Sequence, residues 1–168
     1  MVGRVWEEIE VKVPATEAWK LYGSLQLAKI VGEGLPNLFS RVEVVEGDGS
    51  AGTIVRVVFA PGDDEIGNRE GGAIVVEEKF TVVDDERRVK EAEVVEGGYL
   101  DLGFTLYRVR LEVIEKEGKK EECMTRSTIE YELKEEAAAN AASVSIEHLR
   151  AIMKLAADYL TKNYNTNN

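Results

Sequence analysis

Two strand-like runs, at residues 75–83 and 89–96, each carry one ionisable residue on a face that is otherwise apolar. Alternate side chains of a β-strand point to the same face. That face would hold Val76, Glu78, Phe80 and Val82 in the first run, and Lys90, Ala92 and Val94 in the second. A carboxylate and an ammonium that point inward are costly unless they are paired or used. The pattern therefore predicts an interior that holds a ligand as well as a packed core.

The N-terminal part of the chain predicts one strand and two short helices. Residues 5–13 alternate between apolar and charged side chains, which is typical of a strand with one face in water. Residues 14–36 show the helical spacing of apolar side chains. Gly23 and Gly32 are expected to divide this segment into two helices, and Thr16 is a candidate N-cap.

Six more strands and a long helix are expected after this point. The strands are predicted at residues 40–46, 53–60, 75–83, 89–96, 103–117 and 122–134, with Gly- and Asp-rich turns that favour an antiparallel meander. The Ala-rich segment at residues 135–164 has apolar residues at intervals of three and four, which predicts a helix. Such a sheet can curl around the helix and leave a cavity that one helix does not fill.

We therefore predict a single α+β domain over residues 1–168. Its fold is expected to be a seven-stranded curved antiparallel sheet wrapped around a long C-terminal helix. Two short helices would lie between the first and second strands, and an internal cavity would hold a ligand.

The formal net charge of −11 argues against several classes of partner. Nucleic-acid binding and attachment to anionic membranes are not expected, because both need clustered Lys and Arg. The sequence has no apolar run of the roughly 18 residues that a membrane span needs, and no signal-peptide core, so a cytosolic protein is expected. The single cysteine, Cys123, is expected to be a small buried residue.

Metal and cofactor sites are not predicted. The sequence offers no cluster of Cys, His and Asp with the spacing of metal ligands, and no Ser–His–Asp arrangement. The one histidine, His148, lies on the predicted C-terminal helix in phase with polar Ser145. We expect it on the surface or on a helix face.

Several motifs resemble the plant birch-pollen-allergen family, also called the Bet v I or pathogenesis-related class 10 proteins. The predicted order of elements matches that family, and GDGSAGT at residues 47–53 is similar to its glycine-rich loop. EGGYLDLG at residues 96–103 and RSTIEYEL at 126–133 resemble the norcoclaurine synthase branch, and EEAAANA at 135–141 is similar to the norbelladine synthases. The resemblance implies a helix-grip, START-like fold with an internal ligand cavity.

The resemblance also implies an activity. Enzymes of that branch condense an arylethylamine with an aromatic aldehyde through an iminium, in a Pictet–Spengler-type reaction of plant alkaloid biosynthesis. The branch has a glutamate as base and a lysine as hydrogen-bond donor, which fall on Glu78 and Lys90, the residues that alternation had already selected. Val76 stands where the branch has a tyrosine, and Val109 where it has an aspartate. The segment at residues 61–73 also looks longer than the branch's loop.

The expected partners are a small aromatic amine and an aldehyde, or another apolar plant metabolite, bound by a monomer or weak dimer without a cofactor. The predicted substrate-binding residues are Tyr107, Val76, Val109, Phe59, Phe80, Tyr99, Leu149 and Met153. Two other functions stay open at this point: a non-catalytic carrier of a plant hormone, flavonoid or alkaloid, and a defence-associated storage protein. Glu78 and Lys90 also have a structural alternative, which is an ion pair across the sheet or a place at the barrel rim.

Overall fold

The computed structural model describes residues 1–61 and 74–167 of the chain. The expected long loop at residues 61–73 lies outside this description from residue 62 onward. In chain order the elements are β1 (Val2–Val11), α1 (Ala15–Tyr22), α2 (Gln26–Gly34), β2 (Phe39–Glu46), β3 (Ile54–Phe59), β4 (Val75–Asp84), β5 (Val89–Gly97), the 3-10 helix η1 (Gly98–Leu102), β6 (Phe104–Lys116), β7 (Lys119–Leu133), the 3-10 helix η2 (Glu135–Ser143) and α3 (Glu147–Asn167).

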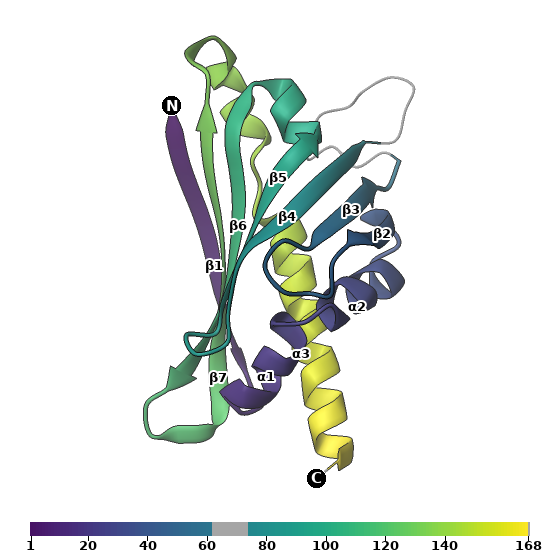
Figure 1. Ribbon diagram of the computed structural model, residues 1–168. Helices are drawn as coiled ribbons and strands as arrows, with labels where there is room; N and C mark the ends of the chain where they lie inside the picture. The colour runs from purple at the N-terminus through teal and green to yellow at the C-terminus, as the bar shows by residue number, and fades with distance from the viewer. Residues whose placement is uncertain (62–73, 168) are drawn as a thin grey trace.

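The strands of the described residues form one antiparallel sheet in the order β1-β7-β6-β5-β4-β3-β2. Figure 1 shows this sheet curving around α3, with α1 and α2 beside that helix on the concave side. The predicted α+β fold, the strand number and the two short helices are therefore confirmed within the described residues.

Alternation gives the sheet two chemically different faces. The concave face carries the apolar core, including the buried Ile129 and Val113. The convex face carries ion pairs between neighbouring strands, such as Arg110 with Glu91 at 2.6 Å. Partly exposed pairs of this kind each contribute little to stability, so the fold depends mainly on burial of the concave face.

One residue of the first strand-like run lies on the opposite face from its prediction. Phe80 pairs with Ala92 and Val82 pairs with Glu91, so β4 contains one extra residue at this point. A bulge of one residue reverses the alternation beyond it. Val82 is therefore 37% exposed, and Val83 packs against the core in its place.

Two details of the helices also differ from the prediction. Thr16 is not an N-cap, because α1 begins at Ala15 directly after Pro14, whose fixed φ suits a helix start. The Ala-rich segment does not form one continuous helix. It forms η2, and the extended Val144 separates η2 from α3.

Candidate functional site

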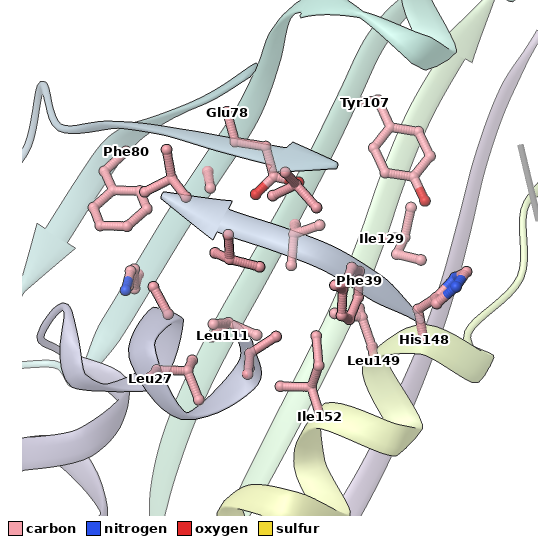
Figure 2. Close-up of a pocket in the computed structure, with 18 of the residues that line it drawn as sticks. Leu27, Phe39, Glu78, Phe80, Tyr107, Leu111, Ile129, His148, Leu149 and Ile152 are labelled. Carbon is pink, nitrogen blue, oxygen red and sulfur yellow. The ribbon is translucent and has the colours of Figure 1, made fainter. Parts of the chain in front are cut away.

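A cavity of about 150 Å³ lies between the concave face of the sheet and helices α2 and α3. Most of its wall is apolar, and its polar groups come from Glu78, Lys90, Tyr99, Tyr107 and His148. Figure 2 shows side chains of the sheet facing those of α3 across this space. A dry, apolar cavity of roughly 150 Å³ holds a benzene-sized ring in a well-studied engineered case. The present cavity therefore has room for about one aromatic ring.

Glu78 points from β4 into this cavity (Figure 2). It pairs with Val94 of β5, next to a register shift that leaves Val95 without a counterpart and 45% exposed. Burial raises the pKa of Glu78 from 4.5 to about 7, because the carboxylate loses its water, and the charge of Lys90 offsets this in part. A carboxyl group with this pKa can accept and release a proton near neutral pH.

Lys90 points into the same cavity from β5 and is 4% exposed. Its Nζ atom donates to the carbonyl oxygens of Tyr22, at 3.2 Å, and Ser24, at 3.4 Å. The same atom lies 4.1 Å from the centroid of the Phe80 ring. Burial lowers the pKa of Lys90 from 10.5 to about 8, and the nearby Glu78 works in the opposite direction. An ammonium has three N–H donors, so two carbonyl contacts leave one for a ligand.

Glu78 and Lys90 both face the cavity, and their charged groups are not in direct contact. They interact electrostatically, yet none of the ion pairs between described residues links them. The structural alternative of a cross-sheet ion pair is therefore not what the geometry shows. An acid and an amine instead share one cavity wall, and burial moves both pKa values toward neutrality. Their catalytic roles stay a prediction.

Tyr99 and Tyr107 form a second polar feature of the wall. Their rings are stacked with centroids 3.7 Å apart and planes 10° from parallel. Burial holds the pKa of Tyr107 well above its usual value, so this phenol stays protonated and can donate a hydrogen bond. The EGGY motif positions Tyr99: Gly97 has a φ of +79°, and a Cβ there would lie 2.3 Å from the carbonyl oxygen of Val75.

His148 lies on the C-terminal helix, as one of the two predicted alternatives had it, but not on the surface. This residue is only 8% exposed and lines the cavity from the first turn of α3. Its ring lies 5.5 Å, centroid to centroid, from the rings of both Phe39 and Phe59. Its phase with Ser145 gave no sign of these contacts, because both phenylalanines are far from it in the sequence. The cavity-facing positions of α3 are His148, Leu149 and Ile152.

The other predicted substrate-binding residues fall into two groups. The structure places Phe59, Phe80, Tyr99, Tyr107, Val109 and Leu149 in the cavity wall. Val76, at 1% exposure, and Met153, at 0%, are buried but are not part of that wall. Both pack into the surrounding core. They were predicted to bind substrate because alternation and helical spacing identify a buried face but do not show which part of that face borders the cavity.

Within residues 1–61 and 74–167, no three His, Cys, Asp or Glu side chains gather in a way that could hold a metal ion. None of the helices in those same residues combines the length and apolar character that a membrane crossing needs.

A curved sheet, a long helix and a cavity with buried ionisable groups define a ligand-binding helix-grip domain. The chain belongs to the pathogenesis-related protein Bet v 1 family, whose model matches residues 1–163. It is 41% identical to norbelladine synthase of Narcissus pseudonarcissus over 160 residues, which cover 95% of this chain and 93% of that protein.

Norcoclaurine synthases are also similar. S-norcoclaurine synthase 2 of Papaver somniferum is 32% identical over 157 residues, which cover 92% of this chain but only 64% of that protein's length. The crystal structure of Thalictrum flavum norcoclaurine synthase in complex with dopamine and hydroxybenzaldehyde superposes with a TM-score of 0.81 at 31% identity. That comparison covers 96% of this chain and 88% of the other.

Proposed function

We propose that this protein is a condensation enzyme that joins an arylethylamine of the dopamine or tyramine type to an aromatic aldehyde through an iminium. The observation that carries the proposal is the pairing of Glu78, whose pKa is raised to about 7, with Lys90, whose pKa is lowered to about 8, in one cavity wall. The similarity to norbelladine and norcoclaurine synthases supports it. The solved relative that holds dopamine and hydroxybenzaldehyde supports the choice of substrates.

Lys90 acts on the aldehyde. Its remaining N–H donates to the carbonyl oxygen, which makes the carbonyl carbon a better target for the amine nitrogen. The resulting carbinolamine takes up a proton as its hydroxyl leaves as water, and a C=N⁺ bond replaces the C–O bond. The carbonyl oxygens of Tyr22 and Ser24 hold the ammonium in place during these steps.

Glu78 acts after ring closure. The electron-rich ring of the amine attacks the iminium carbon, which forms a carbon–carbon bond and leaves a cationic ring that carries one extra proton. The carboxylate of Glu78 accepts that proton, and the ring regains its aromaticity. A general base of this kind contributes roughly 10²- to 10⁴-fold to the rate.

The apolar wall contributes orientation. It removes the reacting atoms from bulk water and fixes the ring against the base, and such positioning supplies several kcal/mol of a typical enzymatic barrier. The described cavity has room for about one ring, so the second reactant requires side chains of the wall to move apart.

The test is a product assay with matched variants. The protein is mixed with dopamine and 4-hydroxyphenylacetaldehyde, or with tyramine and a dihydroxybenzaldehyde, and rate and product chirality are followed. Turnover above the uncatalysed rate with one enantiomer in excess is expected for a ring-closed product. Glu78→Gln and Lys90→Met should lose most of this turnover, while Glu77→Gln and Lys79→Met, at the outward neighbours, should keep it. Racemic product at the uncatalysed rate for all pairs contradicts the proposal.

A carrier function is the second candidate, and the largely apolar cavity wall is the observation that favours it. In that case Glu78 and Lys90 anchor a ligand by hydrogen bonds and no bond is made. A carrier binds an apolar fluorescent probe tightly and gives no turnover with any amine and aldehyde pair.

The proposal also includes an enzyme class, a cellular location and an oligomeric state. An enzyme that releases water from a carbinolamine would be assigned to the carbon–nitrogen lyases, and we place it in the cytosol as a monomer or weak dimer. Light scattering coupled to size-exclusion chromatography tests the assembly, and fractionation of the source tissue tests the location.

A further inference from the structure

An aromatic cluster lies in the cavity wall where β2, β3 and α3 meet. It consists of Phe39, Phe59 and His148, and we call it the aromatic corner. The ring centroids of Phe39 and Phe59 are 5.6 Å apart, and each lies 5.5 Å from the His148 ring. All three side chains line the cavity and are at most 8% exposed. The mechanism above uses none of them.

The aromatic corner lies apart from the groups that carry the proposed chemistry. Figure 2 shows Phe39 and His148 at the α3 side of the pocket, across from Phe80, with Glu78 on the sheet between them. His148 is followed by the aliphatic Leu149 and Ile152 in the same wall of the helix. Among the residues that α3 contributes to the wall, His148 is therefore the one aromatic side chain, and together with Phe39 and Phe59 it offers an aromatic surface to a reactant ring.

The neutral reactant suits this place better than the amine does. A protonated amine is attracted by the carboxylate of Glu78, whereas an aldehyde carries no charge and depends on apolar and stacking contacts for its affinity. An aldehyde whose ring rests on the corner directs its carbonyl arm past Glu78 toward the Phe80 side of the cavity, where Lys90, the proposed donor to its oxygen, lies.

We propose that His148 makes this cavity selective for aryl over saturated aldehydes, by completing the aromatic surface on which the aldehyde ring stacks. This inference rests on the proposed function for the identity of the reactant. The role needs only the flat ring of His148, so a phenyl ring at this position is expected to replace it and an aliphatic side chain is not.

The test compares two unreactive probes that differ only in ring saturation, 2-phenylethanol and 2-cyclohexylethanol. Their dissociation constants are measured by NMR titration of the intact chain without amine. Wild-type protein should prefer the phenyl probe. His148→Leu should reduce that preference roughly 2- to 10-fold, the range that one aromatic contact supports, while His148→Phe should retain it. An unchanged preference in His148→Leu overturns the inference.

Met153→Leu is the matched control, because Met153 is buried on the same helix but lies outside the cavity wall. It should leave the preference as it is. A second measurement needs no variant: the ring protons of bound 2-phenylethanol should show nuclear Overhauser effects to the ring protons of His148. Absence of these effects in a saturated complex also overturns the inference.

These outcomes separate the inference from the proposed function. The probes are measured without amine, so a protein that gives no turnover can still show a weaker preference for the phenyl probe in His148→Leu. That result would reject the enzyme function and keep the ring selectivity. Turnover with an unchanged probe preference in His148→Leu rejects the role of His148 alone.

Discussion

The ammonium nitrogen of Lys90 lies 4.1 Å from the centre of the Phe80 ring, and Phe80 is two residues from Glu78 on the same strand. The ring face attracts the cation electrostatically. The carbonyl oxygens of Tyr22 and Ser24 also accept hydrogen bonds from it. Lys90 therefore joins the sheet to the junction of α1 and α2, and a single side chain has both a structural and a proposed chemical role.

Replacing Lys90 is expected to loosen that junction. Lys90→Met removes the only side-chain donor that the described structure gives to the Tyr22 carbonyl. Hydrogen exchange of the backbone amides around residues 22–26 should therefore become faster than in the wild type, because local openings there lose a stabilising contact. Mass spectrometry of deuterium uptake measures this directly.

Lys79→Met is the control for that experiment. Lys79 lies on the outward face of β4 and is exposed, so its loss should leave exchange in the α1–α2 junction unchanged. If Lys90→Met also leaves it unchanged, the two carbonyl contacts do not anchor the junction.

The free energy of unfolding is expected to depend on the protonation of Glu78. Its pKa is about 7 in the folded protein and 4.5 ordinarily, so between these pH values the folded state keeps a proton that the unfolded state releases. Stability from this group therefore falls as pH rises from 4.5 to 7, and the loss persists above pH 7. Glu78→Gln removes the ionisable group and with it this loss of stability. The unfolding free energy of the variant should therefore exceed that of the wild type by up to about 3 kcal/mol above pH 7.

Urea denaturation at two pH values measures this effect. The gain of Glu78→Gln over the wild type should be present above pH 7 and absent below pH 4.5, where both folded and unfolded wild-type chains hold the proton. Glu77→Gln, on the convex face, should show no such pH dependence. A gain that is the same at both pH values would place its origin in packing and not in the buried charge.

The proposed reaction should have a narrow pH optimum. Glu78 must be ionised to accept a proton, so kcat/KM should rise as pH passes about 7. Lys90 must be protonated to donate, so kcat/KM should fall as pH passes about 8. Initial rates across this range should give a bell-shaped profile. The alkaline limb should disappear from the residual activity of Lys90→Met; if it stays, another group is the donor.

Alternation was sufficient to identify Glu78 and Lys90, because the inward face of a strand is fixed by a period of two unless a bulge intervenes. It failed at Val82 because nothing in the residue types around Thr81 marks the extra residue in β4. The element order and the two short helices followed from turn residues and apolar spacing in the same way.

The inner limits of the cavity could not be read from the sequence. Val76 and Met153 have the same burial signature as residues of the wall, since both kinds of position are apolar and inward. The cavity contact of His148 was missed for the opposite reason: its polarity suggested a surface, while its ring packs against two phenylalanines that precede it by about 90 to 110 residues. Contacts of such long range depend on how helix and sheet meet.

Restoring the tyrosine of the norcoclaurine synthase branch should damage this protein. Val76 is 1% exposed and outside the cavity wall, so a tyrosine ring at this position has no space to enter. Overpacking of a filled core costs about 1–3 kcal/mol. Val76→Tyr should lose that amount in urea denaturation, whereas Val75→Tyr, at a 38% exposed position of the same strand, should not. A Val76→Tyr variant that keeps wild-type stability would show that the cavity extends to this position.

The size of the cavity should make a two-ring ligand bind slowly. A volume of about 150 Å³ suits one aromatic ring, so a ligand that contains both rings of the condensation product has to wait for wall side chains to move. Binding that requires such a change falls below the usual association rates of roughly 10⁵–10⁷ M⁻¹s⁻¹. Stopped-flow measurements should give a hyperbolic dependence of the observed rate on concentration for the two-ring product, and a faster, linear one for 2-phenylethanol. Equal, linear dependences for both ligands would mean that the cavity is already wide enough, and that both reactants enter without rearrangement.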